Sequence, residues 1–177
     1  MNYFLIPKIS RNLLDNSVIS YFLEKGNNWK PCNWSIIPYI LSEEDKTLIK
    51  PILNKLPVMP IGIALLTTPA NSITATHQDH LPNPPTFDNV TKSTGRITAI
   101  NIALKNYKNS WVEFYDVEEK NYNDKVFYHD DTAVCLRVDL LHRVNNFNND
   151  ENRVVLTFSY AYEHTTLFNI LKTSELL

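Results

Sequence analysis

Glycine is scarce in this sequence, with 3 residues among 177. Loops that cradle phosphates and the nucleophile elbow of hydrolases both depend on closely spaced glycines. Three glycines are too few to build such a loop, and no G-x-S-x-G motif occurs. The sequence therefore lacks the signatures of the common nucleotide-binding and serine-hydrolase sites.

Cysteine is also rare. Cys32 and Cys135 lie in different contexts, without a C-x-x-C or other zinc-binding spacing. A disulfide framework is not expected, and the default location is a reducing cytoplasm, of the cell or of a host. Neither cysteine has a basic neighbour in the sequence, so thiol catalysis is not indicated.

The chain has neither a large charge imbalance nor a long apolar run. A formal net charge of −2 provides no electrostatic footprint for nucleic acid or an anionic membrane. No apolar run approaches the ~18–20 residues of a membrane span, and the N-terminal apolar patch is too short for a signal peptide. We expect one soluble globular domain with no membrane contact and no evident nucleic-acid surface, although a nucleic-acid substrate is not excluded.

The first third of the chain has helical periodicity. Apolar residues recur at helical spacing over 9–25, and Gly26 follows as a stop signal. A second helix is predicted over 42–56, where Ser42 is a suitable N-cap and Pro51 kinks or divides the helix. Residues 1–59 are thus expected to form a helical buttress against one face of a sheet.

From residue 60 the pattern changes to short segments rich in β-branched and aromatic residues, separated by turn formers. The predicted strands are 61–67, 72–78, 96–104, 111–117, 125–128, 133–138, 142–145 and 153–162. So many short strands predict a mainly β fold with N-terminal helices, a jelly roll or barrel-like sandwich over 60–163. Residues 164–177 are expected to close the chain as a helix.

The stretch Thr74 to His80, "TATHQDH", carries three metal-capable side chains. In a strand, His77 and Asp79 project to the same side, while His80 faces the opposite side. Two ligands bind a metal weakly, and His142 is the best candidate for a third. Two histidines and one carboxylate are the ligand set of non-heme Fe(II), which keeps open positions. The alternative is a structural His–Asp hydrogen bond.

Arg153 stands at the entry to the last strongly apolar strand, "VVLTFSYAY". A guanidinium entering an apolar barrel is costly unless an anion meets it. A dicarboxylate co-substrate that chelates the metal at its other end would provide that anion. The alternative is an ion pair with Glu151 or Asp150 in a surface turn.

The order His77-x-Asp79, His142, Arg153 resembles the Fe(II)- and 2-oxoglutarate-dependent dioxygenases, most of all their small hydroxylase-like members in phage and bacteria. The segments "RITAINIAL" and "LLHRVNN…ENRVVLTFSY" look like core strands of that family. The resemblance implies a double-stranded β-helix, with Fe(II) on the triad and the far carboxylate of 2-oxoglutarate on Arg153. It also implies that O2 and 2-oxoglutarate are consumed, succinate and CO2 released, and the prime substrate hydroxylated.

The sequence departs from the family pattern after Arg153. Many members place Ser or Thr two residues after this arginine, where this chain has Val155, and Thr157 is the expected substitute on the same strand face. Some relatives contact the co-substrate through Arg or Asn in the strand that begins near Arg96. Arg96 and Asn101 differ by an odd number, so only one is expected to point inward, and Arg96 is favoured.

The substrate itself is not readable from these motifs. The proline-bearing segment 81–95 follows Asp79 and is the expected determinant of substrate choice. Two other classes of function share the predicted fold. One is a metal-binding, cupin-like isomerase or hydrolase without 2-oxoglutarate, and the other is a non-catalytic jelly-roll module for binding or structure.

Overall fold

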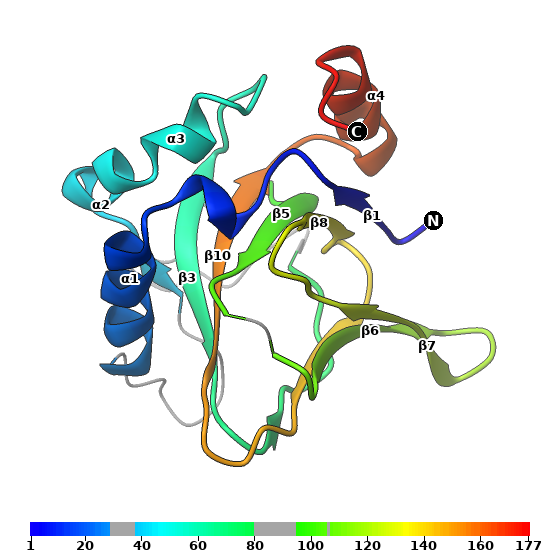
Figure 1. Cartoon of the computed structure of the whole chain (residues 1–177). Helices are drawn as coiled ribbons and strands as arrows, with labels where there is room; N and C mark the ends of the chain where they lie inside the picture. The colour runs from blue at the N-terminus through cyan, green and yellow to red at the C-terminus, as the bar shows by residue number, and fades with distance from the viewer. Residues whose placement is uncertain (29–37, 80–94, 106) are drawn as a thin grey trace.

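The computed structural model describes residues 1–28, 38–79, 95–105 and 107–177, and two antiparallel sheets form its centre (Figure 1). The larger sheet has six strands in the order β1-β8-β5-β10-β3-β2, and the smaller has four in the order β4-β9-β6-β7. The strands are β1 (Tyr3–Ile6), β2 (Tyr39–Ile40), β3 (Gly62–Thr68), β4 (Ser72–Ile73), β5 (Thr98–Ala103), β6 (Ser110–Asp116), β7 (Asn121–Phe127), β8 (Ala133–Arg137), β9 (His142–Asn146) and β10 (Arg153–Tyr160). The predicted jelly roll is confirmed.

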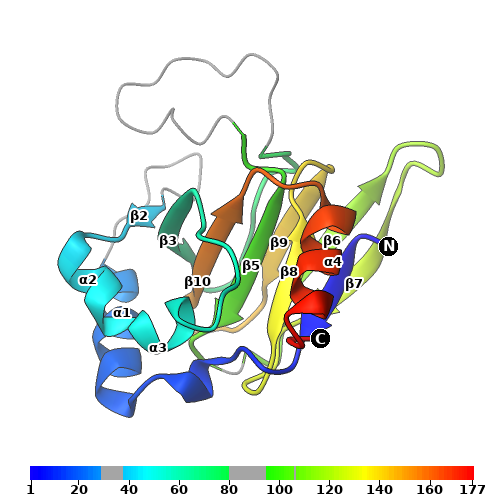
Figure 2. The same cartoon turned by 90° about the horizontal axis from the view of Figure 1, so that it is seen from above.

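The helices cover the outer face of the larger sheet (Figure 2). They are α1 (Asn16–Asn28), α2 (Glu43–Leu48), α3 (Lys50–Leu53) and α4 (His164–Thr173), with a short 3-10 turn, η1 (Arg11–Leu13), before α1. Phe22 of α1 and Leu167 of α4 pack in one buried cluster with Leu156 and Phe158 of β10. This cluster is an apolar core between the helices and the sheet.

A second core lies between the two sheets. Ala99 and Ala103 of β5 belong to it, together with Val112 and Phe114 of β6 and Val144 of β9. Successive residues of a strand face opposite sides, so β5 and β8 of the larger sheet contribute side chains to both cores. The interior of the jelly roll is therefore a separate compartment from the helix-covered core.

The first predicted helix is two elements instead of one. Leu14, with φ −106° and ψ 145°, is extended and separates η1 from α1. Gly26 is not a stop, because it lies inside α1. A Cβ at Gly26 would lie 2.6 Å from a methyl carbon of Val154, so this glycine is needed where α1 approaches β10.

The second predicted helix is confirmed in its cap and its division. The Ser42 hydroxyl accepts a hydrogen bond from the backbone of Asp45, whose carboxylate accepts one from the Ser42 backbone. This reciprocal pair is a capping box. The helix divides at Ile49, next to Pro51, into α2 and α3.

One predicted strand is much shorter than expected, and one strand was missed. The segment 72–78 is a regular strand only over Ser72–Ile73. Tyr3–Ile6 was not predicted as a strand, yet it pairs with β8 at the edge of the larger sheet. A run of four residues is too short to display a period of two in the sequence, so its partner strand decides its conformation.

Some sequence-based expectations concern residues outside the described part of the chain. Cys32, His80 and all but the last residue of the segment 81–95 are among them. Cys135, on β8, is a free and buried thiol whose pKa burial raises. Within the described residues, no helix combines the length and apolar character that a membrane crossing requires.

Candidate metal and co-substrate site

The predicted metal ligands converge at one end of the jelly roll, although they do not share a regular strand. The backbones of His77 and His142 form a reciprocal antiparallel pair, with N–O distances of 2.9 and 2.8 Å. This pairing places the two imidazole rings 4.5 Å apart between centroids. One ligand atom from each of His77, Asp79 and His142 lies within 4.8 Å of the others, within reach of a single ion.

Both imidazoles have the tautomer that metal binding requires. The Nδ1 atom of His77 lies 2.8 Å from the Ala75 carbonyl oxygen, and that of His142 lies 2.8 Å from the Leu140 carbonyl oxygen. A carbonyl oxygen accepts only, so each Nδ1 carries the proton and donates it. Nε2 is then the nitrogen of each ring that is available to a metal, as in metal-ligating histidines held by a backbone carbonyl.

Burial differs between the two rings. The side chain of His77 is 40% exposed, whereas His142 is buried under Phe114 and the paired strands. Burial lowers the pKa of His142, an effect that the nearby Asp79 carboxylate opposes. His142 is therefore neutral at physiological pH, and a metal ion does not have to compete with a proton for it.

Arg96 lies against the proposed metal carboxylate. Its Nη1 atom is 3.0 Å from Oδ2 of Asp79, and its Nη2 atom donates to the Thr157 hydroxyl at 3.0 Å. The other oxygen of Asp79, Oδ1, lies 3.6 Å from Nε2 of His77. Arg96 thus binds one carboxylate oxygen of Asp79, and the other oxygen lies on the side of the imidazoles.

The parity argument that set Arg96 against Asn101 was wrong. Arg96 precedes β5, which begins at Thr98, so the alternation of a strand does not govern its direction. Asn101 is directly opposite Thr157 in the β5–β10 pair, and Thr157 accepts the hydrogen bond from Arg96. Both side chains therefore lie on the inner side of the larger sheet.

Arg153 is buried inside the jelly roll, with 2% of its surface exposed. It does not pair with Glu151, because Glu151 forms an exposed ion pair with Lys105 at 2.5 Å. Its guanidinium carbon lies 4.4 Å from the centre of the Tyr128 ring. Its Nε and Nη2 atoms are buried without a hydrogen-bond partner among the described residues. A charged group in this state fits an anionic ligand.

Tyr128 is the residue at this site that the sequence did not identify. It follows β7, is buried, and its hydroxyl accepts a hydrogen bond from the Asn101 amide at 3.0 Å. Its only sequence signal was an aromatic residue at the end of a predicted strand. The Oδ1 atom of Asn101 is buried without a partner among the described residues.

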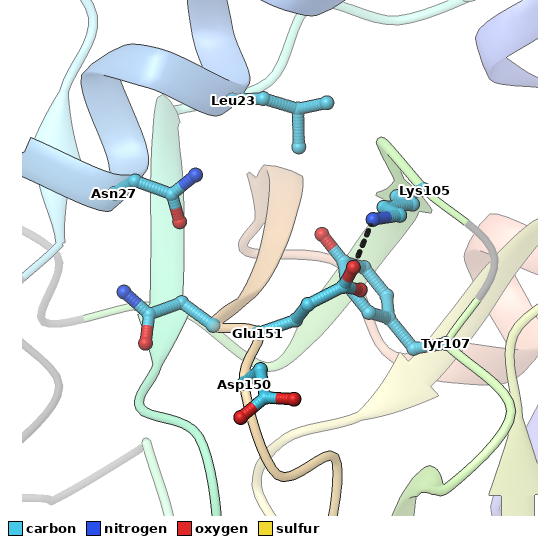
Figure 3. A pocket seen from close by; sticks show the side chains of 7 residues that line it. Leu23, Asn27, Lys105, Tyr107, Asp150 and Glu151 are labelled. Carbon is cyan, nitrogen blue, oxygen red and sulfur yellow. Dashed lines mark hydrogen bonds and ion pairs between the residues drawn. The ribbon is translucent and has the colours of Figure 1, made fainter.

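Two open clefts lie elsewhere on the described part of the molecule. Figure 3 shows one of about 310 Å³, between α1 and the Lys105–Glu151 ion pair. The other, of about 410 Å³, is lined by Tyr21, Lys25 and Tyr39. Neither cleft is lined by a metal-ligand candidate or by Arg153.

Comparison with known proteins adds evidence on the fold. No family model and no curated protein sequence matches the chain. Among solved structures, the viral collagen prolyl hydroxylase of Paramecium bursaria Chlorella virus-1, determined with 2-oxoglutarate, matches with a TM-score of 0.54 and 11% identity. The match covers 90% of this chain and 95% of that protein. The chain has the fold of the Fe(II)- and 2-oxoglutarate-dependent oxygenases.

Two further structures support this fold assignment. A prolyl-4-hydroxylase of Pseudomonas putida matches with a TM-score of 0.53 and 9% identity, covering 91% of this chain and 93% of that one. The α-ketoglutarate-dependent epimerase SnoN of nogalamycin biosynthesis matches with a TM-score of 0.52 and 13% identity, covering 93% and 78%. This oxygenase fold therefore carries more than one reaction, and the function has to be argued from the site.

Proposed function

We propose that this protein is an Fe(II)- and 2-oxoglutarate-dependent oxygenase that hydroxylates a substrate still to be identified. The observation that carries the proposal is the convergence of His77, Asp79 and His142, together with the buried Arg153 on β10. Arg96 links Asp79 to Thr157 on the strand face that also carries Arg153. The three ligands are the set associated with non-heme Fe(II). Arg153 supplies what a dicarboxylate co-substrate needs at its other end.

The residues of the site have distinct roles in this proposal. His77 and His142 bind the metal through Nε2, held in that orientation by the carbonyl groups of Ala75 and Leu140. Asp79 binds through one oxygen, because Arg96 holds the other. Arg153 binds the far carboxylate, and Thr157 orients Arg96 beneath the metal ligands.

Fe(II) held by His77, Asp79 and His142 would supply open coordination positions for the oxidation of a substrate by O2, coupled to the decarboxylation of 2-oxoglutarate to succinate and CO2. The chain's own contribution is to orient the ligands and to exclude water from the co-substrate. Its interior is lined by apolar side chains, which include Ala103, Val112 and Phe114. Such a setting strengthens the charge interactions made inside it.

The test is an anaerobic titration of the metal-free protein with Fe(II) and then 2-oxoglutarate. We expect a visible metal-to-ligand absorption band in the wild type and its loss in His142→Ala. His129→Ala is the matched control, because His129 is exposed and lies outside the triad. A folded wild type without the band would contradict the proposal.

The same titration distinguishes the other classes of function. A cupin-like isomerase or hydrolase would bind metal through the triad without a response to 2-oxoglutarate. A non-catalytic module would bind neither tightly. Oxygen uptake with formation of succinate would then establish the oxygenase chemistry, and product analysis with a substrate would separate hydroxylation from other oxidations.

A further inference from the structure

We propose that Tyr122 is a positioning residue for the metal site, because it joins the two histidine-bearing segments from the outer side of the smaller sheet. The inference rests on the proposed function, since it concerns the ligands His77 and His142. It goes beyond the triad by assigning a role to a residue of β7, a strand that carries none of these ligands.

The segment that carries His77 departs from the regular ladder of the smaller sheet. Ile73 pairs with Asn145, whereas His77 pairs with His142. Four positions separate 73 from 77, but only three separate 142 from 145, so the segment contains one extra residue. Such a β-bulge turns the side chains beyond it to the opposite face of the sheet. Ile73 is therefore exposed on the outer side, while the ring of His77 meets that of His142.

The bulge also weakens the attachment of this segment to β9. Thr74 donates its backbone N–H to the Val144 carbonyl at 2.9 Å, but the Val144 N–H donates to the Thr74 hydroxyl at 2.8 Å. A regular antiparallel ladder would exchange two backbone bonds at such a pair. Within the described residues, only His77 and His142 then exchange both backbone bonds between the segment 74–77 and β9. Side-chain contacts therefore carry more of the order of this segment.

Tyr122 supplies such a contact. Its hydroxyl group and that of Thr76, the residue before His77, hydrogen-bond to each other. The face of its ring lies against Arg143, the residue after His142, with the guanidinium carbon 3.6 Å from the ring centre. Successive residues of a strand face opposite sides, so these neighbours lie on the outer side when the two ligands face the interior. One ring thus contacts the chain neighbour of each histidine ligand.

The residues around this ring are fixed to the sheet. Arg143 lies opposite Glu113 in the β6–β9 pair, and its Nε atom donates to the Glu113 carboxylate at 2.6 Å. Glu113 is buried and also accepts from Nε1 of Trp111 at 2.8 Å. Tyr115, the partner of Tyr122 in the β6–β7 hairpin (Figure 1), meets its ring edge to face at 5.1 Å between centroids. Strand β6 therefore holds both the ring and the guanidinium that it covers.

The first experiment measures amide hydrogen exchange in the metal-free chain by NMR. The backbone N–H groups of His77 and His142 lie in the reciprocal pair, so their exchange reports the opening of that pair. Tyr122→Ala should accelerate this exchange about tenfold, since an exposed hydrogen bond and a cation–π contact each shift such an equilibrium a few-fold. Phe127→Ala is the matched control, because it removes another ring of β7, which contacts Trp111 instead.

The second experiment measures the dissociation constant of Mn(II) by calorimetric titration. Tyr122→Ala should raise this constant about tenfold, the lower range for loss of a group behind the metal ligands. Phe127→Ala should leave it unchanged.

Two smaller changes isolate the hydroxyl contact. Tyr122→Phe and Thr76→Val each remove one partner of the same hydrogen bond, and each should raise the Mn(II) dissociation constant about threefold. The double variant should bind Mn(II) as the single variants do, because the two changes remove one shared interaction. Thr76→Ser restores the hydroxyl group, so it should bind Mn(II) more tightly than Thr76→Val.

A positioning role differs from a purely structural role in what these two changes affect. Urea unfolding of metal-free Tyr122→Phe and Thr76→Val should match that of the wild type, because their hydrogen bond lies at the surface. A purely structural role would give the reverse result, with a lower unfolding midpoint and an unchanged dissociation constant.

The proposal is overturned if Tyr122→Ala leaves the exchange at His77 and His142 unchanged, or if it binds Mn(II) as tightly as the wild type. Should Tyr122→Ala fail to fold, additive effects of Tyr122→Phe and Thr76→Val, or no effect of either, overturn it. The exchange experiment uses no metal. A wild type that binds no Mn(II) would refute the proposed function, and accelerated exchange in Tyr122→Ala would still show that Tyr122 joins the two segments.

Discussion

The two faces of strand β10 carry different sets of side chains. Its outer face presents Val154, Leu156, Phe158 and Tyr160 to the helix-covered core, and its inner face carries Arg153 and Thr157 with Val155 between them. Both faces are fully buried. The outer face is held by apolar packing alone, whereas the inner face buries the charge of Arg153, which an anionic ligand would neutralise. One strand therefore separates a compartment that stabilises the fold from a compartment that binds.

The largest expected effect concerns the outer face. Leu156→Ala should lower the free energy of unfolding by about 3 kcal/mol, because Leu156 is fully buried and its truncation leaves a cavity. Denaturant unfolding measures this loss, and the metal affinity of the folded variant should equal that of the wild type. A large fall in the metal affinity of the folded variant would contradict the view that the two faces of β10 act separately. Leu48→Ala, on an exposed face of α2, is the control.

The reverse result is expected at the metal ligands. Loss of an outer-shell partner of a metal ligand weakens metal binding by up to about 100-fold. His77→Ala removes a ligand itself, so it should weaken metal binding by more than this. Its unfolding free energy in the absence of metal should stay within about 0.5 kcal/mol, because the side chain is 40% exposed. Metal titration and denaturant unfolding of the same preparation test both statements. Destabilisation comparable to that of Leu156→Ala would contradict them.

A buried charge on the helical side sharpens the comparison. Asp45 accepts hydrogen bonds from Tyr21, Lys25, Tyr39 and Ser42, so its charge is satisfied within the chain. Burial alone would raise the pKa of Asp45, but these donors, Lys25 first, hold it well below its ordinary value. Asp45→Asn should cost about 2 kcal/mol of unfolding free energy at pH 7.

The pH dependence of this cost has a definite sign. A carboxylate with a lowered pKa contributes stability above its unfolded pKa of about 4, and that stability is lost as the pH falls toward the folded value. The difference in unfolding free energy between the wild type and Asp45→Asn should therefore stay constant between about pH 5 and about pH 8. It should shrink below about pH 4. Urea unfolding across this range is the measurement. A difference that grows in acid would refute the assignment.

The smallest effect is expected for Arg96→Met. This change leaves the three ligands in place and removes the group that holds one oxygen of Asp79. Metal affinity should fall about tenfold, the lower range for outer-shell changes. Arg96 contacts Asp79 and Thr157, whereas Arg153 lies over the Tyr128 ring. Binding of glutarate, a dicarboxylate without the 2-oxo group, to the metal-free variant should therefore remain near the wild-type value. Calorimetric titration with Mn(II) and with glutarate measures the two separately.

The sequence predicted the parts of the molecule that periodicity and motif order encode. The strands β3, β5 and β10, rich in apolar and β-branched residues, and the order of His77, Asp79, His142 and Arg153 are of this kind. The separation of η1 from α1 was not predictable, because apolar spacing continues through Leu14 although its backbone is extended. Long-range contacts were also missed. Tyr128 beneath Arg153 results from how the chain returns after β7, which no local pattern records.

The reciprocal backbone bonds between residues 77 and 142 have a consequence for the order of biosynthetic events. In the sequence, His77 precedes the strands β5 to β8 and His142 follows them. The two rings therefore meet only after those strands have been synthesised and paired. A partly made chain has no complete set of ligands. An ion that needs all three ligands would therefore bind only after this part of the chain has folded.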